Sequence, residues 1–62
     1  INVGGKLVYV EGQSGIVDLS KEEISFKFNK KKCTIKGSDL YMKYYDKTTA
    51  IVCGSIVSVV VL

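Results

Sequence analysis

The side chains that could take part in chemistry are few and dispersed. The chain has two cysteines, Cys33 and Cys53, six carboxylates and no histidine. Without an imidazole, neither thiol has the base partner that cysteine hydrolases use, and a zinc ion would lack nitrogen ligands. The two cysteines fall on opposite faces in the strand pattern, so we expect no disulfide between them. We therefore predict no catalytic residues, no metal site and no cofactor.

The carboxylates lie mostly beside expected turns. Asp39, in the run GSDL, is expected to accept a hydrogen bond from a nearby backbone N–H in an Asx turn. Glu22 and Glu23 are neighbours, and because adjacent side chains of an extended chain point apart, they form a poor cation site. These acidic residues indicate turns more than acid catalysis.

Lysine supplies all nine basic residues. Lys30, Lys31 and Lys32 form the densest charge cluster, which we interpret as an exposed hairpin tip able to contact phosphate or an acidic partner. The tyrosine- and lysine-containing segment 41–47 suggests a stacking surface for single-stranded nucleic acid. A small basic β-barrel that binds nucleic acid is thus the alternative function, although the absence of arginine disfavours it.

Glycines mark changes of phase in the apolar pattern. Aligned on Gly12, Gly37 and Gly54, apolar or small residues recur four and two places before each glycine, and three, five and seven places after it. Because side chains alternate faces along a strand, such a change requires an extra residue or a bend. Glycine permits both, since it tolerates the positive φ angles of β-bulges. The residues expected to face the core after these glycines are Gly15, Val17, Leu19, Leu40, Met42, Tyr44, Val57, Val59 and Val61.

Period-two alternation predicts an all-β fold with glycine-marked bends. A turn at residues 29–31 is expected to close a hairpin, and SKEE at residues 20–23 is interpreted as a turn rather than a helix start. A small barrel or sandwich is the expected architecture, and a short β-roll or solenoid is the alternative. The strands, about seven in number, are expected near residues 6–10, 16–19, 24–28, 33–35, 40–45, 49–53 and 56–61.

The length of 62 residues fits a single domain spanning residues 1–62. A domain of this size has a thin core, which favours oligomerisation. The start, INVGG, has neither an initiating Met nor a signal core, so we expect a fragment that lacks its N-terminal segment. A net charge of +3 indicates only modest attraction to acidic partners, and reduced thiols suggest a cytosolic setting.

The C-terminal run VSVVVL carries apolar residues on both faces. Such a strand must be covered on both sides or form an edge that pairs with another chain. We therefore expect a protein partner, or self-association, through this edge. The candidate partner-binding residues are Lys30, Lys31, Lys32, Val57, Val59 and Val61.

The order of three motifs resembles the YabP/YqfC family of bacterial sporulation proteins. They are YVEGQSGIVDLSKEEISFKF, CTIKGSDLYMKYY and IVCGSIVSVVV, and the similarity spans residues 6–60. The resemblance implies a non-enzymatic assembly or adaptor protein of a Gram-positive spore former. It also implies a location in the mother-cell cytoplasm, peripheral to the developing spore envelope, in a membrane-associated complex. It supplies no catalytic residues.

Overall fold

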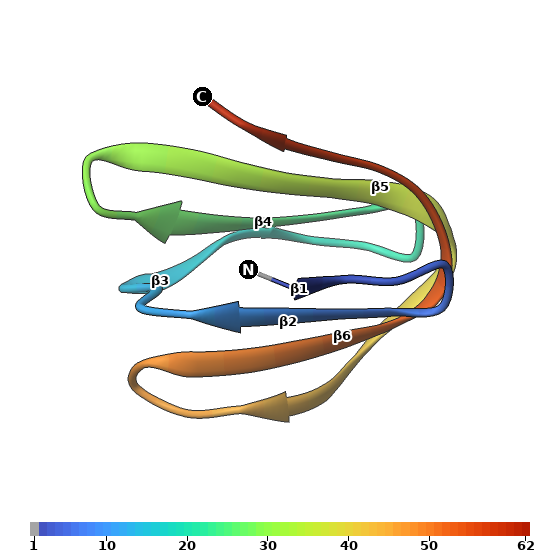
Figure 1. Ribbon diagram of the computed structural model, residues 1–62, viewed down its shortest axis with the longest axis horizontal. Coiled ribbons are helices and arrows are strands. Elements are labelled where there is room, and N and C mark those ends of the chain that lie inside the picture. The colour runs from blue at the N-terminus through green and yellow to red at the C-terminus, as the bar shows by residue number, and fades with distance from the viewer. Residues whose placement is uncertain (1) are drawn as a thin grey trace.

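A computed structural model describes residues 2–62, which form one antiparallel sheet of six strands (Figure 1). The strand order across the sheet is β1-β2-β6-β5-β4-β3. The all-β prediction is confirmed, but the open single sheet does not confirm a barrel or a sandwich, nor a roll or solenoid. The strands are β1 (Asn2–Val3), β2 (Leu7–Glu11), β3 (Gly15–Leu19), β4 (Glu23–Phe28), β5 (Lys31–Tyr45) and β6 (Thr49–Val61).

Residues 2–62 contain six strands rather than about seven because two of the marked glycines bend a strand without ending it. β5 runs through Gly37 and β6 runs through Gly54, so each joins two of the expected segments, while β1 is additional. The β5–β6 register shifts next to both glycines, as the change of phase predicts. Gly54 has a φ of 135°, whereas Gly37 has no positive φ. A glycine is needed at position 37 for a steric reason, because a Cβ there would collide with the Ser55 carbonyl oxygen.

The bends in β5 and β6 divide the sheet into two arms, which meet where these strands curve at the right of Figure 1. Arm A contains β3, β4, residues 31–38 of β5 and residues 55–61 of β6. Arm B contains β1, β2, residues 40–45 of β5 and residues 49–53 of β6. The inner faces pack together, because each arm alone would leave an apolar face in water. The buried core comprises Ile24, Phe26, Cys33 and Ile35 of arm A with Val8, Val10, Leu40, Ala50 and Val52 of arm B.

The crossover at residues 12–14 ties the two arms together at the end opposite the bend. Gly12, at a φ of 89°, donates its N–H to the Thr48 carbonyl over 2.6 Å. Gln13 is buried between the arms, and its Nε2 donates to the Asp46 carbonyl over 2.8 Å. Its Oε1 is buried without a hydrogen-bond partner among the described residues. The bend expected at Gly12 is confirmed, and Gln13 is a structural contact that the apolar pattern did not indicate.

The expected inward positions are correct where the pairing stays regular and wrong beside bulges. Leu40 is buried and Met42 packs against the core, as predicted. Tyr44 is exposed, because the register shifts between Met42 and Tyr44. Val17 and Leu19 are also exposed, because β3 is an edge strand whose pairing with β4 shifts between Ile16 and Asp18.

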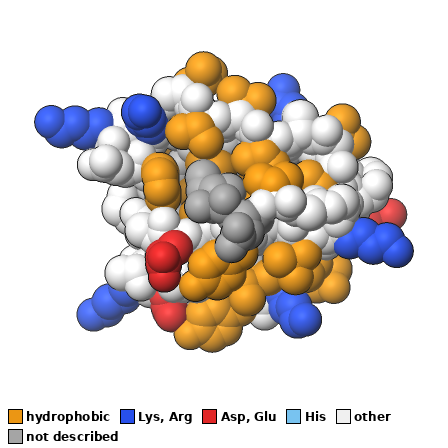
Figure 2. All heavy atoms as spheres, viewed as in Figure 1, with side chains coloured by type: hydrophobic (Ala, Val, Ile, Leu, Met, Phe, Trp, Pro, Cys, Tyr) orange, Lys and Arg blue, Asp and Glu red, His pale blue; other side chains and the backbone are white. Residues whose placement is uncertain are grey.

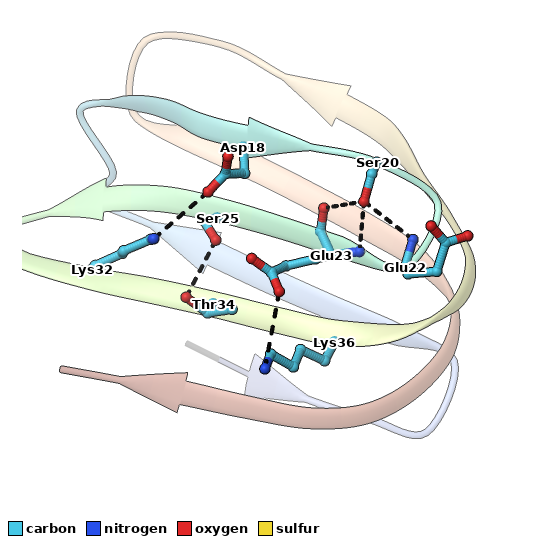
Figure 3. Close-up of polar contacts among 8 residues, drawn as sticks. All are labelled: Asp18, Ser20, Glu22, Glu23, Ser25, Lys32, Thr34 and Lys36. Atoms are coloured by element: carbon cyan, nitrogen blue, oxygen red, sulfur yellow. Dashed lines mark hydrogen bonds and ion pairs between the residues drawn. The ribbon is translucent and has the colours of Figure 1, made fainter.

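The SKEE turn between β3 and β4 is confirmed. The Ser20 hydroxyl accepts a hydrogen bond from the Glu23 N–H and donates one to the Glu23 carbonyl, each over 3.0 Å (Figure 3). A serine hydroxyl commonly substitutes in this way for backbone partners in a turn. The turn directs the chain from β3 straight into β4 without a helix.

Candidate interaction surface

β6 changes its surroundings at Gly54. Its first half, residues 49–53, pairs with β2 on one side and with β5 on the other. Its second half pairs with β5 along residues 55–61, and within residues 2–62 no other strand pairs with it there. Apart from the Ile56 N–H, which donates to the Gly5 carbonyl, the second half is therefore an open edge of arm A, and backbone hydrogen-bonding groups are available along it.

The hydrogen bonds at the C-terminus show which backbone groups these are. Leu62 and Lys32 exchange two bonds, of 2.8 and 2.9 Å. In an antiparallel ladder such pairs alternate, so Val60, two residues earlier, also faces β5. Val59 and Val61 then direct their N–H and C=O groups away from β5, toward the open edge.

Val57, Val59 and Val61, all predicted to face the core, differ in exposure along this edge. Val57 lies at the register shift opposite Gly37 and is 77% exposed, so the prediction that it faces the core is wrong. Val59 packs against the core, as predicted. Val61 lies opposite the buried Cys33, on the predicted side, but it is 41% exposed and so does not join the core, and Leu62 is 84% exposed. Val59 thus offers only its backbone to a partner, whereas Val57, Val61 and Leu62 offer apolar side chains.

The lysine tip lies at the same end of arm A as the C-terminus. Asn29 and Lys30 have φ angles of 48° and 65° and form a two-residue turn, which confirms the expected hairpin. Lys31 and Lys32 follow on opposite faces of β5, so the three ammonium groups do not form one cluster. Lys32 makes a 3.6 Å ion pair with Asp18 of β3 (Figure 3). Because Lys32 is bonded to Leu62, the structure brings this tip and the end of β6 together.

The tyrosines of residues 41–47 are all exposed: Tyr41, Tyr44 and Tyr45. The Tyr44 hydroxyl donates to the Asp46 carboxylate over 2.7 Å. The hydroxyl of Tyr9 on β2 lies 3.5 Å from a carboxylate oxygen of Glu11. These contacts place a carboxylate beside the hydroxyl of Tyr44 and another beside that of Tyr9.

Asp46, rather than Asp39, makes the Asx turn. The Asp46 carboxylate accepts the N–H groups of Thr48 and Thr49 over 2.9 and 2.7 Å. The bond from Tyr44 and these two amides hold the pKa of Asp46 below its usual value. Within residues 2–62 the Asp39 side chain accepts no such bond, and Asp39 instead adopts a φ of 53° at the bend. The predicted Asx turn at Asp39 is therefore wrong.

Both cysteines are free and buried, which agrees with the expectation that they do not pair. Burial in the core raises the pKa of the Cys33 thiol. Cys53 lies on the outer face of arm B, between Leu7 of β2 and Tyr41 of β5. Across residues 2–62, no three His, Cys, Asp or Glu side chains lie close enough together to hold a metal ion.

A pocket opens at the bend, next to Cys53. The residues that line it are Gly5, Lys6, Tyr41, Cys53, Gly54 and Ser55. The sequence pattern did not reveal this pocket, because its residues come from three separate segments that meet only once β5 and β6 bend. The glycines near its rim were the available signal, but a glycine also fits an ordinary turn.

No family model and no curated protein matches this chain. Among residues 2–62 there is also no helix of sufficient length and apolarity to cross a membrane.

Proposed function

We propose that this domain is a non-enzymatic assembly module that associates by adding a partner strand to the open edge of β6. The observation that carries the proposal is that Val59 and Val61 direct their backbone groups to a side where residues 2–62 provide no strand. An extended segment placed there would gain main-chain hydrogen bonds, as in other cases of β-strand addition. The exposed Val61 and Leu62 side chains would be covered at the same time.

The partner strand is that of a second copy. Residues 55–62, SIVSVVVL, contain no charged side chain, so two copies can pair antiparallel without placing like charges opposite one another. A two-fold axis beside Val60 sets Val59 of each copy opposite Val61 of the other. Both residues point their N–H and C=O groups outward, so the paired sheets become continuous. The contact is short, and we expect weak, reversible association.

Sedimentation velocity over a concentration series tests this mode of association. The native protein should shift toward a dimer as concentration rises, and Val61→Lys should remain monomeric because it places a charge at the paired edge. The matched control is Val17→Lys, which puts the same charge on the other edge strand, β3. Val61 and Val17 are 41% and 50% exposed, and thermal melting checks that both variants are folded before they are compared. A native protein that stays monomeric, or equal effects of the two lysines, would contradict the proposal.

The biological setting that we propose is sporulation, in the mother-cell cytoplasm at the developing spore envelope. The support is the order of the three motifs that resemble the YabP/YqfC family, together with an edge suited to assembly. In this setting the lysine tip, next to the end of β6, orients the module toward an acidic protein or membrane face.

Counting heat-resistant spores from a strain that lacks the gene tests this setting. Native protein should restore the count, and Val61→Lys should not, whereas Val17→Lys should. A folded variant with Lys30, Lys31 and Lys32 all changed to Glu should restore it poorly if the tip makes a contact. Unchanged spore counts in the deletion strain would argue against the sporulation role. They would not bear on association through β6, which sedimentation tests separately.

A further inference from the structure

The pocket at the bend is held open by backbone contacts. The Gly54 N–H donates to the Lys6 carbonyl over 3.2 Å, and the Ile56 N–H donates to the Gly5 carbonyl over 3.0 Å. These bonds fix the β1–β2 turn beside β6, so that the turn forms one wall of the pocket. The cavity has a volume of about 390 Å³, within the range of small-molecule sites.

The side chains that line this pocket are all capable of donating hydrogen bonds. Lys6 contributes an ammonium group, Tyr41 and Ser55 contribute hydroxyls, and Cys53 contributes a thiol. The lining contains no carboxylate, and neither ion pair found within residues 2–62 involves Lys6. A ligand with acceptor atoms and negative charge complements this set, because a carboxylate forms charge-assisted hydrogen bonds with an ammonium group.

Part of the remaining wall is apolar. The ring of Tyr41 and the Cα atoms of the two glycines supply apolar surface there. A side chain at Gly5 would meet no protein atom within 4 Å, so the space beside it is open. On the face drawn in Figure 2, apolar side chains are spread among polar surface, and lysines project at the periphery.

We propose that this pocket binds a small organic anion, a carboxylate carried on a compact aromatic or aliphatic body. The carboxylate accepts hydrogen bonds from the Lys6 ammonium and the Tyr41 hydroxyl, and the body lies against the Tyr41 ring and the glycine backbone. The site lies at the bend and reaches β6 only at Cys53, Gly54 and Ser55, whereas the proposed association uses the backbone of Val59 and Val61, so the two proposals rest on different residues.

The tyrosine and the thiol in this pocket also interact with each other. The neighbouring Cys53 side chain raises the pKa of the Tyr41 hydroxyl, chiefly through a charge interaction. Tyr41 therefore keeps its proton, and its ability to donate to a carboxylate, throughout the neutral pH range.

Phenylacetate is a suitable probe, with the neutral phenylacetamide as its matched control. Titration followed by ¹H–¹⁵N NMR should shift the amide signals of Lys6, Gly54 and Ser55, and phenylacetamide should bind at least about tenfold more weakly, because it lacks the charge that Lys6 pairs with. Lys6→Met should weaken phenylacetate binding by a similar factor. Lys43→Met, which removes an exposed lysine from the same arm but outside the pocket, should leave binding unchanged.

A second readout uses the thiol. Phenylacetate should slow the reaction of Cys53 with iodoacetamide, while Cys33, in the core, reacts slowly with or without it. Gly5→Val, which fills the open space beside the pocket, should reduce both effects. Equal binding of phenylacetate and phenylacetamide, no loss in Lys6→Met, or no shift of the pocket signals at millimolar phenylacetate would overturn the proposal. The monomeric Val61→Lys variant should bind phenylacetate normally, so a failure of the association proposal is distinguishable from a failure of this one.

Discussion

The two halves of β6 have similar composition but very different surroundings. Residues 49–53 lie between two strands, and Ala50, Val52 and Cys53 are buried. Residues 55–61 have a strand on one side only, and Val57 is among the most exposed apolar residues of the chain. Apolar, β-branched composition therefore predicts a strand in both cases, but the neighbouring strand decides whether that strand is core or surface.

The other edge of arm A, strand β3, sharpens this contrast. β3 carries a bulge between Ile16 and Asp18, and Asp18 lies outward in an ion pair with Lys32 (Figure 3). Bulges and outward charges are the usual devices that keep edge strands from pairing with other chains. Past its bulge at Val57, the second half of β6 has no charged residue. We infer that one edge of arm A is protected and the other is left available.

The largest effect is expected at the residue that separates the two halves of β6. In Gly54→Ala, the new Cβ would lie 2.6 Å from the Asp39 carbonyl oxygen, at a φ of 135° that alanine rarely adopts. Strain and overpacking together should cost about 2–6 kcal/mol. A domain of this length is stable by only roughly 3–9 kcal/mol, so most of the free energy of unfolding should be lost.

Gly5→Ala is the matched control for this variant, because a Cβ at Gly5 meets no atom within 4 Å. Its free energy of unfolding, measured by urea denaturation, should stay within about 0.5 kcal/mol of the native value. Similar stability in the two variants would mean that Gly54 does not define the bend.

The bend shows how far the sequence could predict this fold. The change of apolar phase at Gly12, Gly37 and Gly54 correctly located the three bends, because a parity change has few structural solutions. It could not show that Gly37 is needed for close approach to Ser55, since that contact depends on β6 lying beside β5. Nor could it show the positive φ of Asp39, which only the shifted register explains.

The candidate surface was predictable to a similar extent. Apolar residues on both faces of VSVVVL predicted either a strand covered on both sides or an open edge, and in the described residues 2–62 this strand lies at an edge. The bulge that exposes Val57 was not predictable, because its position depends on pairing with Gly37. The pocket was not predictable either, since Lys6 and Cys53 are far apart in sequence and meet only through the order β2-β6-β5. Local pattern thus predicts strands and bends, but not what the bends bring together.

A pair of valine truncations compares the halves of β6 directly. Val52→Ala removes two methyl groups from a fully buried site and should cost about 2–3 kcal/mol, from lost burial and the cavity that remains. Val57→Ala removes the same groups from a side chain that is mostly in water, and should change stability by less than about 0.5 kcal/mol. Thermal and urea unfolding of the two variants gives the comparison. A large cost at Val57 would show that the second half is covered in solution, and sedimentation would then identify whether a second copy covers it.

The turns at the far ends of the two arms offer a smaller test. The arm A turn holds Lys30 at a φ of 65°, which costs a lysine about 1–2 kcal/mol but costs glycine little. Lys30→Gly gives the Asn-Gly pair favoured in such hairpins, and should stabilise the protein by about 0.5–1 kcal/mol after the entropy cost of glycine. Lys31→Gly, at a strand position without positive φ, should instead destabilise it. An equal response of the two positions would contradict the observed turn.

The arm B turn depends on charge where the arm A turn depends on backbone conformation. The Tyr44 hydroxyl is the main cause of the lowered pKa of Asp46, followed by the Thr48 and Thr49 amides. A carboxyl whose pKa is lower in the folded state stabilises the fold above its unfolded pKa, about pH 4, and this contribution is lost as the pH falls through the folded value. Tyr44→Phe should therefore raise the pKa of Asp46 toward its usual range, and the two amides should keep it partly lowered.

Carboxyl ¹³C NMR titration measures this shift, and Tyr45→Phe is the control, because Tyr45 is equally exposed but makes no bond to Asp46 among the described residues. Tyr44→Phe should also make the free energy of unfolding fall less steeply below about pH 4. The reason is that the folded and unfolded pKa values of Asp46 then differ less, so protonating Asp46 removes less stabilisation. If the pKa of Asp46 were the same in both variants, the amides alone would hold the turn. The Tyr44 hydroxyl would then be available to a ligand on the outer face of arm B.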